Sequence, residues 1–187
     1  GPSGGCIPAS MADTEIDYEE LTKMGAMMGS GGMVVLDDTD CMVDMARYFL
    51  TFTHKQSCGK CTFCRIGTKQ MLNIVTQLSE GKASLSDIGE LEILCKSVKD
   101  GSLCGLGKTA PNPVITGLMY FREEYEAHTK GLCPARKCRD LIKYAVTDDC
   151  NGCTKCSQEC PVKAIPFNPY EKHEIDQLIC TKCDNCR

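Results

Sequence analysis

The sequence predicts a mainly α-helical protein: a four-helix up-and-down bundle, preceded by a short β remnant and followed by a small α+β domain rich in cysteine. Three observations predict this fold class. Between residues 40 and 130, apolar residues recur at helical spacing in four stretches that only short joints separate. A short apolar run precedes these stretches. The chain has 16 cysteines in 187 residues, and those in residues 149–187 follow a repeated pattern.

Residues 1–39 are predicted to be the tail of a preceding β-containing domain. They are rich in Gly, Met and acidic residues, and "GGMVVLDD" predicts a short strand at about Met33 to Leu36 after a glycine turn. The glycines do not suit a phosphate-binding loop, because no Lys-Ser/Thr pair follows them. The chain lacks an initiator Met and ends one residue after a cysteine, so we expect both ends to be cut.

The first two helices of the predicted bundle follow directly. Thr39 and Asp40 are candidate caps, and apolar residues at helical spacing then predict a helix to about Thr53. A second predicted helix runs from about Cys61 and stops before Gly81, which suits the left-handed position that often follows a helix.

The third predicted helix begins at Ser84, with Asp87 three residues later as in a capping box, and ends near Gly101. The fourth has Asn112 as its cap and a proline at its first position, and it runs to about Thr129. In an up-and-down bundle the joint between the first two helices and the joint between the last two lie at the same end. The start of the first helix and the end of the fourth lie at the other end.

Three cysteines in the first joint lack a fourth partner nearby in the sequence. The joint reads "SCGKCTFCR", and the joint between the last two helices reads "SLCGLGK". Bundle connectivity brings these joints together, so we expect one 4Fe-4S cluster held by four thiolates. The expected ligands are Cys58, Cys61, Cys64 and Cys104. A structural zinc site is the alternative, because zinc also accepts four thiolates.

The last part of the chain carries a more specific pattern. Residues 150–161 read "CNGCTKCSQECP", which is the C-x2-C-x2-C-x3-C-P run of bacterial ferredoxins, and the triplet recurs as "CTKCDNC". In such repeats the fourth cysteine of a run serves the other cluster. One 4Fe-4S cluster is therefore expected on Cys160, Cys180, Cys183 and Cys186, and another on Cys150, Cys153 and Cys156 with its fourth ligand beyond the C-terminus. Zinc is again the alternative.

A third kind of site is predicted at the far end of the bundle. "AHTKGLCPARKC" spaces His128, Cys133 and Cys138 so that they can close a small loop on a metal, and Cys41 lies at that end too. A set of three cysteines and one histidine suits a closed structural zinc site. A surface histidine beside two free thiols is the alternative. Cys95 is a rival ligand, but its place on an apolar helix face favours the core.

These patterns divide the chain into four parts: 1–39, the tail of a preceding domain; 40–130, a four-helix iron-sulfur domain; 131–148, a linker with candidate zinc ligands; and 149–187, a truncated two-cluster ferredoxin-like domain.

Composition narrows the function classes. The net charge is -4, with both signs interspersed, so no basic stripe favours nucleic-acid binding. No apolar run reaches the length of a membrane span, and the first ten residues do not resemble a secretory signal. A reducing cytoplasm is the expected location, because clustered thiolates suit it.

The motifs also carry a resemblance. "SCGKCTFCR" with "LCGLGK" resembles the C-terminal iron-sulfur domain of the NADH-binding flavoprotein subunit of respiratory complex I, over roughly residues 1–130. The ferredoxin-like segment is similar to the version found in NAD(P)-linked, often electron-bifurcating, iron-only hydrogenases and related formate dehydrogenases. "GPSGGCIP" and "FREEYEAH" point the same way. The resemblance implies that a missing N-terminal part binds FMN and NAD(P).

The function expected from the residues and the resemblance is an iron-sulfur electron relay of an NAD(P)H-linked, multi-subunit oxidoreductase of the bifurcating hydrogenase type. A subunit of a NAD-dependent formate dehydrogenase or of an NADH:quinone oxidoreductase is an alternative, and a zinc-binding assembly module is an alternative of another class. Other iron-sulfur subunits and soluble ferredoxin are the expected partners. No residue is assigned a catalytic role, because the chain has neither a dinucleotide fingerprint nor a flavin pocket.

Overall fold

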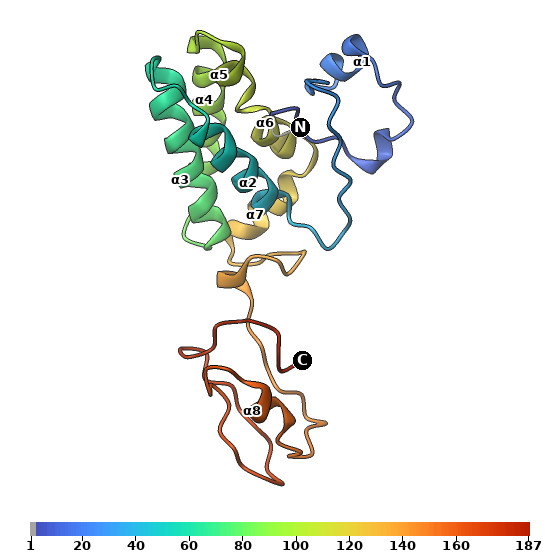
Figure 1. Cartoon of the computed structure of the whole chain (residues 1–187), viewed down its shortest axis with the longest axis vertical. Helices are drawn as coiled ribbons and strands as arrows, with labels where there is room; N and C mark the ends of the chain where they lie inside the picture. The colour runs from blue at the N-terminus through green and yellow to red at the C-terminus, as the bar shows by residue number, and fades with distance from the viewer. Residues whose placement is uncertain (1–2) are drawn as a thin grey trace. The chain divides into compact units, whose positions relative to one another are not determined.

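The structure is a computed structural model that describes residues 3–187 (Figure 1). The chain forms two compact units, the first extending to Leu141 and the second comprising Ile142–Arg187. Residues 3–187 contain helices and irregular segments but no assigned β-strand, so the prediction of a mainly α-helical protein is confirmed. Within the same residues, no helix combines the length and the apolar composition that crossing a membrane requires.

The N-terminal part of the first unit holds a short 3-10 helix, η1 (Ala9–Met11), and a helix of less than two turns, α1 (Tyr18–Lys23). The strand predicted at about Met33 to Leu36 is wrong. The side chains of Met33, Val34 and Val35 are 60 to 83% exposed. A strand needs a partner for its backbone groups and a face to bury, and the described residues provide neither here.

Two of the predicted helices appear with modified starts. α2 (Met42–Lys55) begins after Cys41, which takes the N-cap position expected of Thr39 or Asp40. The second predicted helix consists of a π-helical turn, η2 (Phe63–Gly67), which continues as α3 (Thr68–Ser79). π-helical turns are rare and occur frequently at functional sites. Here the π-helical turn contains Cys64.

The third predicted helix is α4 (Leu85–Gly101), and its start has the predicted capping contact. The backbone N-H and the hydroxyl of Ser84 both donate to Oδ2 of Asp87, at 2.6 and 2.7 Å. The sequence did not indicate the next helix, α5 (Gly105–Thr109). It follows Cys104, which occupies its N-cap position.

The fourth predicted helix is broken into α6 (Asn112–Tyr120) and α7 (Arg122–Thr129), with Phe121 outside helical geometry at φ -130° and ψ 31°. The break returns Tyr125 to the core, where its side chain is fully buried. A Cβ at Gly117 would lie 2.6 Å from the Tyr125 hydroxyl oxygen, so the tyrosine packs directly over the glycine. One uninterrupted helix would not bring these two residues into contact.

One hydrophobic core joins the helices of the first unit, and α3 and α4 lie side by side around it (Figure 1). Each helix from α2 to α4, together with α6 and α7, contributes fully buried side chains. These include Val43, Leu50, Met71, Val75, Leu78, Leu91, Val98, Val114 and Tyr125. The helices that form this core also hold the ends of the cysteine-bearing loops.

The second unit contains one short helix, α8 (Lys155–Glu159), between irregular segments. The prediction of an α+β domain is wrong for strand content, since no residue from 142 to 187 is assigned to a strand. Its buried apolar side chains are few, Ala164 and Ile165 among them. A unit this small with so little core needs another source of stability, such as bound metal.

Candidate metal centres

The structure brings Cys41, His128, Cys133 and Cys138 together. Their ligand atoms all lie within 4.8 Å of one another. Nε2 of His128 is 3.3 Å from Sγ of Cys41 and 3.3 Å from Sγ of Cys138, and the two sulfur atoms are 3.7 Å apart. Tetrahedral zinc, with Zn-S near 2.3 Å and Zn-N near 2.0 Å, places its ligand atoms about 3.5 to 3.8 Å apart. The distances among Cys41, His128 and Cys138 are close to this spacing, and Cys133 lies near enough to be the fourth ligand of one ion.

Neighbouring groups orient these four side chains. Nδ1 of His128 lies 2.6 Å from the carbonyl oxygen of Glu124, which can only accept, so Nδ1 carries the proton and Nε2 presents its lone pair. The backbone N-H groups of Lys137 and Cys138 point at Sγ of Cys133, at 3.3 and 3.5 Å. Such N-H groups stabilise a thiolate, which is the form of cysteine that binds metal.

The electrostatics of the set also favour a thiolate. The hydrogen bond that Cys138 donates, followed by the contact with the His128 ring, lowers the pKa of the Cys41 thiol to about 4 in spite of its burial. The same contact with Cys41 raises the pKa of Cys138, because a proton shared by the two sulfur atoms stays on Cys138. Cys95 lies elsewhere, in the core beside Met71, and burial raises its pKa to about 12.

The joint after α2 and the loop after α4 meet at Cys61 and Cys64. The backbone N-H of Leu103, followed by that of Cys64, lowers the pKa of the Cys61 thiol. Gly107 packs so closely that an added Cβ would collide with the Ser102 hydroxyl and lie 3.1 Å from Cβ of Cys64. The loop that carries Cys104 therefore lies against two of the three cysteines of the joint.

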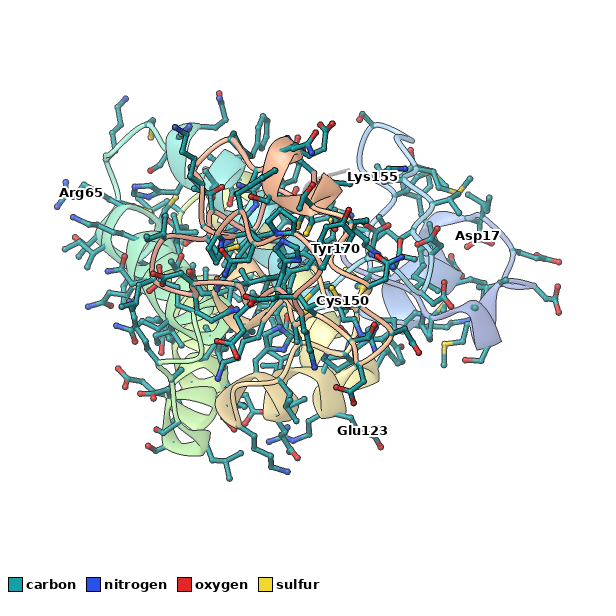
Figure 2. All side chains as sticks on the ribbon, turned by 90° about the horizontal axis from the view of Figure 1, so that it is seen from below. Asp17, Arg65, Glu123, Cys150, Lys155 and Tyr170 are labelled. Carbon is teal, nitrogen blue, oxygen red and sulfur yellow. The ribbon has the colours of Figure 1, made fainter. Side chains whose placement is uncertain are left out.

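Two further observations at this place fit an iron-sulfur cluster. The hydroxyl oxygen of Ser102 is buried, and a hydrogen bond from this hydroxyl is among the contacts that lower the pKa of the Cys61 thiol. A cluster sulfur would accept that hydrogen bond. Arg65, which Figure 2 labels, donates from its guanidinium to the carbonyl oxygen of Gly59 at 2.7 Å and so holds the loop between Cys58 and Cys61. Cys58 and Cys104 are themselves exposed.

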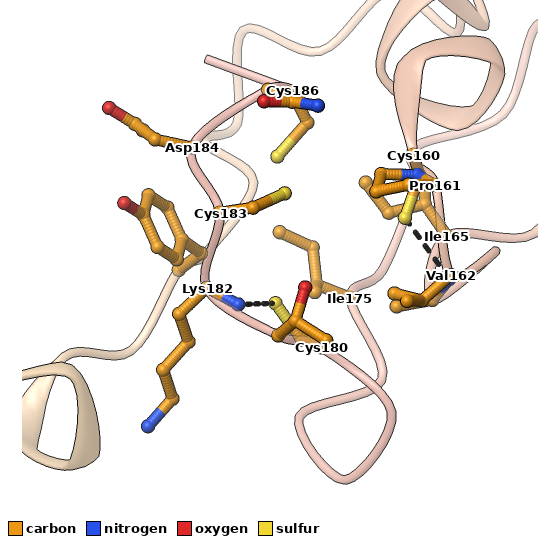
Figure 3. Close-up of a pocket in the computed structure, with 14 residues that line it drawn as sticks. Cys160, Pro161, Val162, Ile165, Ile175, Cys180, Lys182, Cys183, Asp184 and Cys186 are labelled. Carbon is orange, nitrogen blue, oxygen red and sulfur yellow. Dashed lines mark hydrogen bonds between the residues drawn. The ribbon is translucent and has the colours of Figure 1, made fainter.

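In the second unit, four predicted ligands line a single pocket (Figure 3). They are Cys160, Cys180, Cys183 and Cys186. Apolar side chains, including Val162, Ile165 and Ile175, form other parts of the wall. The backbone N-H groups of Ala164 and Lys182 donate to Sγ of Cys160 and Cys180, at 3.2 and 3.4 Å. Thiolates around an apolar pocket, with N-H groups on the sulfur atoms, fit a cluster.

Of the remaining predicted ligands, Cys153 is exposed, Cys156 is half-buried on α8, and Cys150 has the most polar contacts. Its Sγ lies 3.8 Å from Nδ1 of His173. The backbone N-H of His173, followed by its side chain, lowers the pKa of Cys150 to about 7. The cysteine pattern does not point to His173 as a functional residue. His173 is the one histidine of residues 142–187, and this was the sequence feature that could have indicated a role for it.

This chain is similar in sequence to a known family and to several known proteins. Residues 44–128 match the family described as the NADH-ubiquinone oxidoreductase-F iron-sulfur binding region. The chain is 44% identical over 175 residues to the NADP-reducing hydrogenase subunit HndC of Solidesulfovibrio fructosivorans, covering 92% of this chain and 36% of that protein. It is 38% identical over 128 residues to the NADH-quinone oxidoreductase F 2 subunit of Rhizobium meliloti, covering 68% of this chain and 30% of that protein.

A solved structure is also similar. The crystal structure of an NAD+-reducing [NiFe]-hydrogenase in the H2-reduced state matches with a TM-score of 0.62 and 30% identity, over 68% of this chain and 22% of that one. The chain spans about a third of the length of the curated relatives named above.

Proposed function

We propose that this chain is the iron-sulfur electron relay of an NAD(P)H-linked, multi-subunit oxidoreductase, because residues 44–128 match the NADH-ubiquinone oxidoreductase-F iron-sulfur binding region. The matched region encloses Cys58, Cys61, Cys64 and Cys104, the proposed ligands of a first 4Fe-4S cluster. Each cluster carries one electron at a time. The chain holds the thiolates, donates N-H groups to sulfur and limits the access of water.

The extent of the similarity favours a hydrogenase-type enzyme. The HndC relative aligns over 92% of this chain, whereas the quinone oxidoreductase relative aligns over 68%. An alignment over 175 of the 187 residues has to include most of the second unit, so we propose that the second unit is a two-cluster ferredoxin-like branch. One cluster would use Cys160, Cys180, Cys183 and Cys186, and the other Cys150, Cys153 and Cys156 with one further ligand.

The proposal also covers the cofactors, the domains, the partners and the location of the protein. FMN and NAD(P) would bind in the portion of the relatives that this chain does not cover, and residues 1–39 would be the end of that portion. Residues 40–130 would act as a four-helix bundle, 131–148 as the linker and 149–187 as the ferredoxin-like branch. Other iron-sulfur subunits and soluble ferredoxin would exchange electrons with the clusters. Thiolate-held clusters need a reducing compartment, so the proposed location is the cytoplasm.

We also propose a structural zinc ion on Cys41, His128, Cys133 and Cys138. The mutual distances, at most 4.8 Å, support one ion better than a cube, whose ligands bind different irons. The ion would join the start of α2 to the turn after α7.

The single observation that carries the proposed function is the family match, which encloses Cys104 together with the three cysteines after α2. The test is anaerobic analysis of iron, sulfide and zinc per chain, with optical and paramagnetic resonance spectra. In an untruncated chain, three cubes predict about twelve irons, and the proposed zinc site adds one zinc. A Cys104→Ser variant should lose about four irons, whereas the matched control Cys6→Ser should lose none. A colourless protein that contains zinc alone would favour the assembly module instead.

A further inference from the structure

We propose that His173 is a positioning residue for the cluster on Cys150, Cys153 and Cys156, donating a hydrogen bond from Nδ1 to Sγ of Cys150 and thereby raising the reduction potential of that cluster. The inference rests on the proposed function, because it requires a cluster at these cysteines. It assigns a role to a residue that neither the cysteine pattern nor the relatives' names indicate.

The distance identifies His173 as a donor to Cys150 and not as a second ligand. Nδ1 lies 3.8 Å from Sγ of Cys150. Two side chains that bind different irons of one cube are separated by the cluster itself, whereas a ring nitrogen this close to a sulfur is within reach of a hydrogen bond to it. Since Cys150 begins the ferredoxin-type run, the sulfur is the ligand and the imidazole is its neighbour.

Burial determines which ring nitrogen carries the proton. His173 is only 2% exposed, and Nε2 has no hydrogen-bond partner within residues 3–187. With the proton on Nε2, a buried donor would be unpaired and the Nδ1 lone pair would face a thiolate. With the proton on Nδ1, the donor is satisfied and no N-H is orphaned. An unpaired buried donor costs roughly 1 to 3 kcal/mol, so the second tautomer is the stable one.

The backbone on both sides of His173 is held in place. The N-H of Tyr170 donates to the carbonyl oxygen of Gly152 at 3.1 Å, and the N-H of Asp176 donates to the carbonyl oxygen of Ala164 at 2.8 Å. Gly152 has a φ of +69°, and a Cβ there would lie 2.5 Å from the backbone nitrogen of Glu171. The segment from Tyr170 to Asp176 is therefore packed against the Cys150 loop, and the imidazole cannot easily turn away.

This contact favours the reduced cluster. Reduction adds one electron, and hence one negative charge, to the thiolate-bound cube. A hydrogen bond to sulfur becomes stronger as that charge grows. Removing the donor should therefore change the ratio of reduced to oxidised cluster about tenfold at a fixed ambient potential, which is a midpoint shift of about 59 mV for a one-electron couple. The reduction midpoint of the cluster should therefore be lower in a variant without the donor than in wild type.

The test is a redox titration of the holoprotein with dithionite, followed by paramagnetic resonance, in wild type, His173→Leu and His173→Asn. The signal of this cluster is identified by its loss in Cys153→Ser. His173→Leu should show the tenfold change with full iron content. His173→Asn should restore the wild-type midpoint, because the asparagine amide can place a donor where Nδ1 was. His54→Leu, a matched histidine change in the first unit, should leave this midpoint unchanged.

Several results would overturn the inference. An equal midpoint in His173→Leu and wild type, at equal iron content, would contradict the hydrogen bond. Equal loss of iron in His173→Leu and His173→Asn would contradict it as well, because it indicates a structural role. If the leucine variant alone does not assemble, pulsed resonance on 15N-histidine wild type decides: weak nitrogen coupling to the reduced cluster supports the hydrogen bond, and none or strong coupling contradicts it. Absence of any cluster that depends on Cys153 would instead contradict the proposed function.

Discussion

Sγ of Cys41 lies 3.3 Å from Nε2 of His128, although 87 positions separate the two residues in the sequence. Cys41 caps the start of α2, and His128 is in the last turn of α7. The beginning and the end of the helical core are therefore joined at one place. A metal ion bound there would close a long loop of chain, which is where a cross-link restricts the unfolded state most.

His128→Leu should remove zinc and lower the thermal stability of the protein. Changing a residue that merely supports a zinc ligand weakens metal affinity by about 10- to 100-fold, and losing a ligand should cost at least as much. Metal analysis after dialysis against a chelator, together with thermal unfolding, measures both effects. Cys6→Ser is the control, because Cys6 belongs to none of the cysteine sets. Unchanged zinc content in His128→Leu would rule out the site.

Gly67→Ala should destabilise the first unit. A Cβ at Gly67 would collide with Cγ2 of Val98, a fully buried and β-branched side chain that has little freedom to move. Such overpacking costs about 1 to 3 kcal/mol. Gly89→Ala is the matched control, because Gly89 lies inside α4 and a Cβ there meets nothing within 4 Å. It should stabilise the helix by about 0.5 to 1 kcal/mol. Denaturant unfolding of both variants tests the pair, and equal effects of the same sign would contradict it.

Ser102→Ala should lower the reduction potential of the cluster proposed on Cys58, Cys61, Cys64 and Cys104. The Ser102 hydroxyl is buried, and its hydrogen bond to the Cys61 thiol is among the contacts that lower the pKa of that thiol. Removing a donor to a cluster sulfur should favour the oxidised state, by about tenfold in the redox ratio if one hydrogen bond is lost. Leu103→Ala, a change at the neighbouring exposed residue, should have little effect on the potential. The same midpoint in Ser102→Ala and wild type would remove this role from the serine.

The helices could be predicted because their signals are local. Apolar spacing and the Ser84 and Asp87 pair define α4 within its own residues. The break at Phe121 could not be predicted, because it depends on Tyr125 packing over Gly117. The strand expected near Val34 failed for a related reason, since strand formation depends on a partner that a short apolar run does not specify.

For the candidate sites, too, some contacts could be predicted from the sequence and others could not. Sequence spacing together with helix connectivity was enough to group Cys41 with His128, and the structure places their ligand atoms in contact. The contact of His173 with Cys150 was not predicted, because it depends on how the loop around Tyr170 folds against Gly152. Irregular segments have no periodicity from which such a contact could be inferred.

Asp87→Asn should reduce stability at neutral pH, and the reduction should disappear in acid. The backbone N-H and then the hydroxyl of Ser84 donate to the Asp87 carboxylate and lower its pKa in the folded state. A carboxyl whose folded pKa lies below its unfolded value of about 3.9 adds stability above that value, and the contribution is lost as the pH falls through the folded pKa. Unfolding midpoints of wild type and variant should therefore differ at pH 7 and converge as the pH falls below the folded pKa of Asp87. Acid releases metal from both proteins alike, so the difference between them isolates Asp87. A difference that stays constant from neutral to acid pH would show that the carboxylate charge does not stabilise the start of α4.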